Sequence, residues 1–152
     1  MGNKRMIINW ILLIAWMLLI FLMSNQPAHI SNQQSNSFIN MLAFFGIDLN
    51  SKLGSLASFV VRKTAHFTEY AVLGFFTYKA VSCDVKDRKK AVLMAQLIST
   101  GYASTDEIHQ MFVPGREGKV FDVMIDSCGA FCGIMVSCIT QKFIEKKKGN
   151  QI

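Results

Sequence analysis

Ionisable residues recur at helical spacing inside an otherwise apolar run between positions 59 and 78. Arg62, His66 and Glu69 stand at i, i+4 and i+7, so on a helix they share one face, with Tyr70 beside it. Ionisable groups inside a membrane segment are costly unless they face other protein groups or water. This run is therefore a candidate functional site, and other parts of the chain are expected to supply its partners.

Two later segments carry suitable partners. Residues 105–116 contain two carboxylates, a histidine, an amide and an arginine: Asp106, Glu107, His109, Gln110 and Arg116. A second segment places Asp122 and Asp126 one helical turn apart, which puts both on one face of a helix.

The three segments read RKTAHFTEYAVLG from Arg62, DEIHQMFVPGR from Asp106 and DVMIDSCG from Asp122. In this order and spacing they resemble the VanZ-like family of membrane proteins, named for a teicoplanin-resistance protein, over roughly residues 24–133. The resemblance implies a membrane fold and a link to glycopeptide resistance. It implies no particular reaction.

Four apolar runs predict an all-α integral membrane bundle of four transmembrane helices, forming a single domain over residues 1–152. The first run spans 18 residues, which at about 1.5 Å each approaches the bilayer core of about 30 Å. Lys4 and Arg5 precede it, as in a signal peptide, but no cleavage site of the A-x-A type follows, so we expect an uncleaved helix. The four helices are expected at about 6–23, 59–78, 91–111 and 122–143.

The region between the first two predicted spans divides into two parts. Residues 31–37 are rich in Asn, Gln and Ser, which predicts an exposed loop. Apolar residues then recur at helical spacing from Phe38 to Leu49, which predicts a short interfacial helix that ends near Gly46.

Cations are unevenly distributed among the segments outside the apolar runs. The N-terminus, residues 79–90 and the C-terminal tail hold 11 Lys and Arg, whereas the other two connections hold 5. By the positive-inside rule, both termini are expected in the cytoplasm and all three motifs at the outer face. The net charge of +6 is therefore interpreted as affinity for a membrane surface, and no nucleic-acid partner is expected.

Several site residues also have a purely structural interpretation. Lys63 suits a helix end anchored at the headgroups, and Asp122 suits a helix N-cap. Ser104 and Glu107 suit a capping box that opens a new short helix. These alternatives stay open at this stage, while Glu69 and Asp126 are expected to be held by Arg62 and Arg116.

Two kinds of site are consistent with these residues. A ligand-binding site for an anionic or lipid-linked envelope ligand, or a glycopeptide, would use Arg62, Lys63, His66, Glu69, Tyr70, Gln110, Arg116, Asp122 and Asp126. An acid/base hydrolase or transferase would draw its catalytic groups from His66, Glu69, Asp106, Glu107, His109 and Asp126. Binding is the first hypothesis and catalysis the alternative. Ion transport is disfavoured because no polar stripe continues through the later helices.

No cofactor or metal is expected from the sequence. The histidines and carboxylates match no zinc signature such as H-E-x-x-H. Two arginines and a lysine in the same motifs would also oppose a divalent cation. The oligomeric state is left open.

Overall fold

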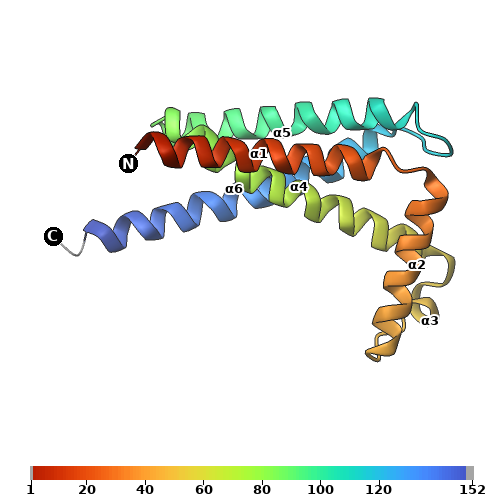
Figure 1. Cartoon of the computed structure of the whole chain (residues 1–152). Coiled ribbons are helices and arrows are strands. Elements are labelled where there is room, and N and C mark those ends of the chain that lie inside the picture. Colours follow the sequence, from red (N-terminus) through yellow and green to blue (C-terminus); the bar gives the residue numbers. More distant parts are fainter. Residues whose placement is uncertain (1, 150–152) are drawn as a thin grey trace.

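The computed structural model describes residues 2–149, which are helical almost throughout and contain no strand. Four long helices run along one another, as Figure 1 shows: α1 (Gly2–Ser24), α4 (Ala57–Asp84), α5 (Arg88–Gln110) and α6 (Val120–Gly149). At one end of this bundle α2 (Ala28–Phe44) turns away at a steep angle and leads into α3 (Leu49–Leu53) and the 3₁₀ helix η1 (Gly54–Leu56). The all-α prediction is confirmed.

Within the described chain, two helices have the length and composition needed to cross a membrane, namely α1 from Asn3 to Ser24 and α6 from Val120 to Lys147. The helices α4 and α5 are long as well, but they carry the polar residues of the motifs and charged residues near their ends. The prediction of a helical bundle is thus confirmed. Of the four expected membrane spans, two are supported by the length and composition of their helices.

The prediction of an exposed loop over residues 31–37 is wrong, because α2 begins at Ala28 and continues through this stretch. Ser35 and Ile39 are buried one turn apart on its inner face. The polar residues therefore belong to an amphipathic helix that packs on α4. The helix ends at Phe44, and Gly46 follows with φ of 87°, in agreement with the predicted stop near that glycine.

Small residues line the contact between α4 and α6, and many large apolar side chains face outward. Gly129 and Gly133 of α6 lie so close to α4 that a Cβ atom on either would overlap the backbone of Phe67 or Ala71. By contrast, Leu18 on α1 and Leu97 on α5 are 57% and 63% exposed. Close backbone approach through small residues, with large apolar residues outside, is typical of helices packed in lipid.

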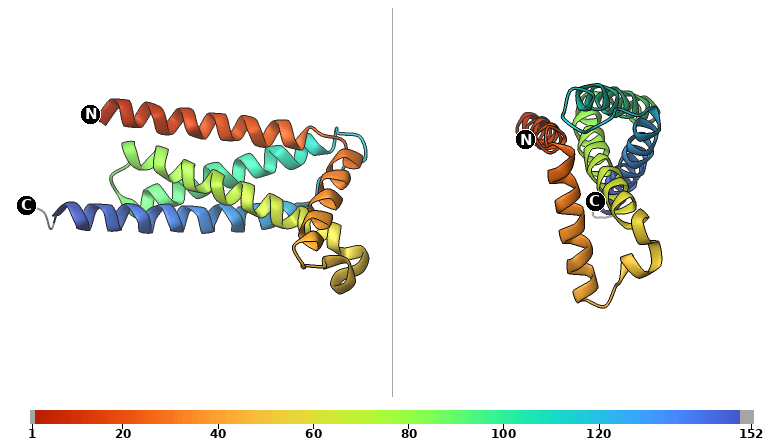
Figure 2. Two further views of the ribbon diagram at one scale, coloured as in Figure 1. Left: turned by 60° about the horizontal axis from the view of Figure 1, so that its bottom comes forward. Right: turned by 90° about the vertical axis from the view of Figure 1, so that its right-hand side faces the viewer.

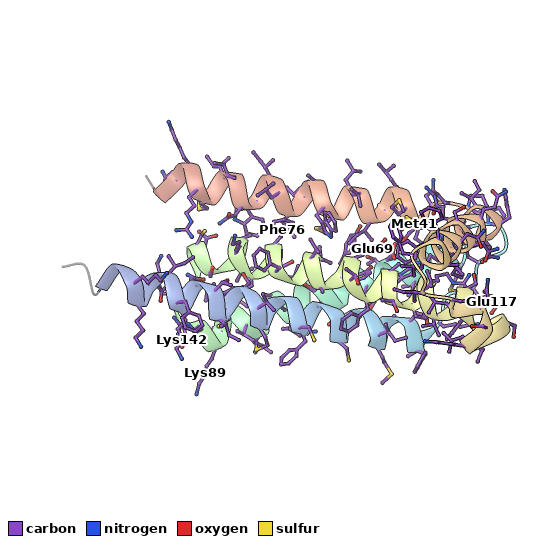
Figure 3. All side chains as sticks on the ribbon, turned by 90° about the horizontal axis from the view of Figure 1, so that it is seen from below. Met41, Glu69, Phe76, Lys89, Glu117 and Lys142 are labelled. Atoms are coloured by element: carbon purple, nitrogen blue, oxygen red, sulfur yellow. The ribbon has the colours of Figure 1, made fainter. Side chains whose placement is uncertain are left out.

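The two ends of the bundle differ in the segments they carry. The start of α1, the α4–α5 connection and the last turns of α6 lie at one end, while α2 and the α5–α6 connection lie at the other (Figure 2). Lys89 and Lys142 accordingly lie at the opposite end from Glu117 (Figure 3). The cation-rich segments are therefore gathered at one end, and the arrangement of the helices places all three motifs toward the other.

Candidate functional site

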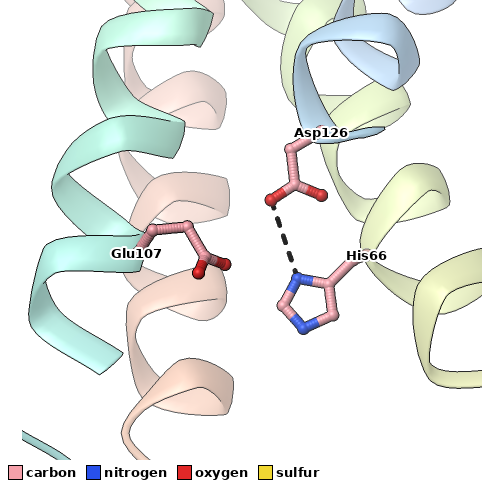
Figure 4. A group of neighbouring side chains, drawn as sticks. All are labelled: His66, Glu107 and Asp126. Atoms are coloured by element: carbon pink, nitrogen blue, oxygen red, sulfur yellow. Dashed lines mark ion pairs between the residues drawn. The ribbon is translucent and has the colours of Figure 1, made fainter. Parts of the chain in front are cut away.

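Three helices bring one ionisable side chain each to a common point near the α2 end of the bundle. His66 comes from α4, Glu107 from α5 and Asp126 from α6 (Figure 4). One nitrogen or oxygen atom from each lies within 4.8 Å of the others. His66 Nδ1 lies 3.8 Å from Asp126 Oδ2. The three motifs, distant in sequence, thus meet in one cluster, which we call the triad.

Two members of the triad are buried, His66 is half-buried, and the cluster is poorly satisfied by hydrogen bonds. Asp126 is fully buried, and Glu107 is 4% exposed. Glu107 Oε2 accepts the backbone N–H of Lys119 at 2.9 Å. Among the described residues, however, Glu107 Oε1, both Asp126 carboxylate oxygens and His66 Nδ1 have no hydrogen-bond partner. Buried polar atoms without partners are costly, so these atoms are expected to meet a further group.

Asp106, adjacent to Glu107 in sequence, faces a different neighbour. Its Oδ2 accepts hydrogen bonds from Ser24 Oγ at 2.9 Å and from Gln110 Nε2 at 3.1 Å. This contact joins α5 to the last residue of α1. Tyr70, also fully buried, packs near Tyr102 in the core between these helices.

Lys63 and Asp122 form an ion pair between α4 and α6, with side chains 17% and 12% exposed. Because α6 begins at Val120, Asp122 lies within the first turn and is not the N-cap. Lys63 is thus a partner of a buried carboxylate as well as a residue near the bundle end. This pair lies one turn from the triad residue Asp126.

The two arginines do not pair with the carboxylates predicted for them. Arg62 Nη1 donates to Asn32 Oδ1 of α2 at 2.9 Å, because the helical course of α2 places Asn32 within reach. Arg116 Nε donates to the Gln26 carbonyl oxygen at 2.9 Å, and its Nη1 donates to Gln110 Oε1 at 3.3 Å. The predicted pairing of these arginines with Glu69 and Asp126 is therefore wrong.

The guanidinium of Arg116 keeps its charge in this partly buried position. Burial lowers the pKa of Arg116 from its ordinary value, and the nearby Arg62 lowers it further. Arginine nevertheless remains protonated at physiological pH. Two cations with neutral hydrogen-bond partners thus stand beside the triad.

Two other sequence interpretations need correction. The helix α5 continues unbroken through Ser104 to Gln110, and the Ser104 hydroxyl donates to the Thr100 carbonyl oxygen, so no capping box opens a new helix there. His109, listed with His66 among the candidate catalytic groups, lies outside the triad: its Nε2 lies 3.2 Å from Asn25 Oδ1, and its ring packs on Phe21 of α1.

Two cavities adjoin the triad. The larger, about 600 Å³, has mainly apolar walls from α1, α2 and α4, together with Glu69. The smaller, about 390 Å³, is lined by charged residues that include Lys63, Lys119 and Asp122. Both cavities are lined by the same four residues where they adjoin: Ser31, Arg62, His66 and Arg116.

Some residues of this site were missed from sequence. Ser24 and Gln26 were interpreted only as the end of the first helix, yet they hold Asp106 and Arg116. Ser31 and Asn32 fell in the stretch predicted as a loop. The spacing of Ser31, Ser35, Phe38 and Leu42, all of which line the larger cavity, carried a signal for an amphipathic helix.

Comparison with known proteins gives one match. The VanZ/LLP1 family model matches residues 9–141, which include every residue of the triad and of the boundary between the cavities. No curated protein and no solved structure matches the chain.

Proposed function

The chain belongs to the VanZ/LLP1 family, and from this premise we propose that it is a multi-pass protein of the cell membrane that binds an amphiphilic envelope ligand with an anionic headgroup. The observation that carries the proposal is the pair of adjoining cavities, one apolar and one cationic. An amphiphile has the same two parts joined in the same way.

The apolar cavity suits an acyl or isoprenoid chain. It opens beside Val61 and Val72 of α4 and Leu42 of α2, which offer an apolar surface. A cavity of this size is within the range of small-molecule sites, and burial of a hydrocarbon chain contributes about 0.8 kcal/mol per CH₂ group.

The smaller cavity suits the headgroup. Arg62 and Arg116 border both cavities, and their guanidinium groups have neutral oxygen partners, so both retain positive charge to offer an anion. A guanidinium binds phosphate or carboxylate in bidentate geometry. We therefore propose a phosphate-bearing or carboxylate-bearing headgroup as the recognised class.

The lengths of the helices support a topology with four membrane spans. At about 1.5 Å per residue, α4 with 28 residues and α5 with 23 would measure about 42 and 35 Å, each longer than the bilayer core of about 30 Å. They lie alongside the two apolar helices α1 and α6, and we propose that all four cross the membrane. With the cation-rich end in the cytoplasm, both termini are cytoplasmic and the cavities face outward.

A second candidate function is hydrolysis of a lipid-linked phosphate ester, favoured by the position of His66. Its ring borders both cavities and its Nδ1 faces Asp126. In this reaction a water oxygen bonds to phosphorus, the bond from phosphorus to the lipid oxygen breaks, His66 takes the water proton, and the lipid oxygen is protonated from solvent. Release of inorganic phosphate from dodecyl phosphate by the purified protein would distinguish catalysis from binding.

The binding proposal predicts that dodecyl phosphate binds more tightly than either of its parts. The probes are dodecyl phosphate, dodecanol and methyl phosphate, added to the protein in lipid nanodiscs. Trp16 lines the apolar cavity, so its fluorescence in a Trp10→Phe background reports occupancy. Arg62→Gln should weaken the binding of dodecyl phosphate about tenfold or more, because a charge-assisted hydrogen bond contributes about 1.5–3 kcal/mol.

Matched variants separate the two halves of the site. Ala65→Phe adds bulk to the wall of the apolar cavity from an exposed position on α4. It should weaken the binding of dodecyl phosphate and of dodecanol alike. Arg88→Gln removes an arginine at the opposite end and should leave binding of all three probes unchanged. Equal binding of dodecanol and dodecyl phosphate, unaffected by Arg62→Gln, would contradict an anion-specific site.

A further inference from the structure

The unsatisfied atoms of the triad converge on one point from three helices. The converging groups are an imidazole and two carboxylates, which are the nitrogen and oxygen donors used by Zn²⁺ and Mn²⁺. Asp126, fully buried, has both oxygens without a hydrogen-bond partner among the described residues, and Glu107 has one. A cation at this point would supply the partner that each of these oxygens lacks.

We propose that His66, Glu107 and Asp126 bind a divalent transition-metal ion. Ligand atoms around such an ion, with bonds of about 2.0–2.2 Å, lie about 3–3.5 Å apart. The spread of up to 4.8 Å seen here requires only small side-chain rotations toward a common centre. The backbone N–H of Lys119 already holds one Glu107 oxygen, an orienting contact typical of metal ligands.

Of the nearby cations, Lys63 has its own carboxylate partner, while Arg62 and Arg116 keep their charge and only the two triad carboxylates offset it at the metal position. Lys63 is neutralised by Asp122, and the guanidinium groups of Arg62 and Arg116 are directed to Asn32, Gln26 and Gln110. The expectation of no metal rested on linear spacing, which does not detect ligands supplied singly by three helices.

Three protein ligands leave a coordination position open. His66 borders both cavities, so this position would lie beside the headgroup cavity, where a phosphate or carboxylate oxygen would complete the coordination. This last step rests on the proposed function, whereas metal binding by the triad does not.

The test measures metal binding directly. The full chain, purified in gentle detergent with its cysteines replaced by alanine, is stripped with a chelator and equilibrated with Zn²⁺ or Mn²⁺. Removing the cysteines matters because Cys128 and Cys132 are exposed and thiols bind Zn²⁺. We expect about one ion per chain by elemental analysis, a change in the Mn²⁺ electron paramagnetic resonance spectrum, and a higher Tm with metal.

The variants Glu107→Gln and Asp126→Asn should lose the bound ion and the metal-dependent rise in Tm. Glu69→Gln is the matched control, because it makes the same chemical change one turn from His66 but outside the triad, and it should retain both. Without metal, Asp126→Asn should unfold at or above the temperature of metal-free wild type, since it removes a buried carboxylate that has no hydrogen-bond partner and whose nearest cationic group, His66, is 3.8 Å away.

The outcomes are distinguishable. If Asp126→Asn fails to fold, Glu107→Gln carries the test, because glutamine still accepts the Lys119 N–H. Folded wild type that binds no stoichiometric ion would overturn the proposal and indicate that the triad shares a proton instead. A stoichiometric metal ion that stays bound in both Glu107→Gln and Asp126→Asn would also overturn the proposal. Binding of dodecyl phosphate to the metal-free protein is measured separately through Trp16 fluorescence, so failure here and failure of the proposed function can be told apart.

Discussion

Asp122→Asn is expected to lower the free energy of unfolding by about 3–5 kcal/mol, because it leaves the largely buried ammonium of Lys63 without a counterion. Lys63→Met should cost a similar amount by leaving the carboxylate unpaired. The double variant should be much closer to wild type, since an apolar side chain and a neutral amide need no charged partner. Unfolding in mixed micelles, followed by circular dichroism, completes the double-mutant cycle.

The exposed pair of Arg88 and Glu145 is the control for this cycle. Its side chains are 41% and 55% exposed at the other end of the bundle, where solvent screens the charges. Its coupling energy should not exceed about 1 kcal/mol. Additive effects of Lys63→Met and Asp122→Asn would show that these two residues do not interact in the membrane.

Expression in a susceptible Gram-positive host is expected to raise tolerance to teicoplanin more than to vancomycin, which lacks an acyl chain. The physical reason is the proposed site, in which the apolar cavity would hold the acyl chain next to cations that would hold a carboxylate. His66→Ala, Glu69→Ala and Asp126→Ala should abolish this selective protection while the protein still reaches the membrane. Minimum inhibitory concentrations of both drugs measure the effect.

The control for that experiment is Arg88→Gln, which alters charge far from the cavities and should protect as wild type does. Unchanged susceptibility to both drugs would show that this chain does not confer glycopeptide tolerance. Protection that survives all three alanine substitutions would assign the effect to something other than the polar cluster.

The features that sequence predicted well depend on local periodicity. Each of the four long helices was expected within a few residues of its observed core, because an apolar run has a clear length. Gly129 and Gly133 have the G-x-x-x-G spacing that is typical of closely packed helices, and the structure shows both against α4. The meeting of the three motifs was also expected, since their costly ionisable groups require partners.

The features that sequence missed depend on tertiary contacts. Arg62 was assigned to a carboxylate because charge is visible in sequence, whereas Asn32 became its partner only through the helical course of α2. A helix cap was one of two interpretations of Glu107, but the unbroken α5 instead directs it toward His66 and Asp126. Pairwise geometry across helices is not encoded in linear spacing.

The central claim is an outward-facing site for an anionic amphiphile, and labelling of Ser31→Cys tests it most directly. Ser31 borders both cavities, and cysteine is close to serine in size. In a cysteine-free background, a membrane-impermeant maleimide should label this position in right-side-out membranes, and dodecyl phosphate should slow the labelling more than dodecanol does. Lys86→Cys, exposed at the opposite end, should react only after the membranes are opened. Labelling of Lys86→Cys but not Ser31→Cys from outside, or labelling of Ser31→Cys that dodecyl phosphate does not slow, would contradict the account.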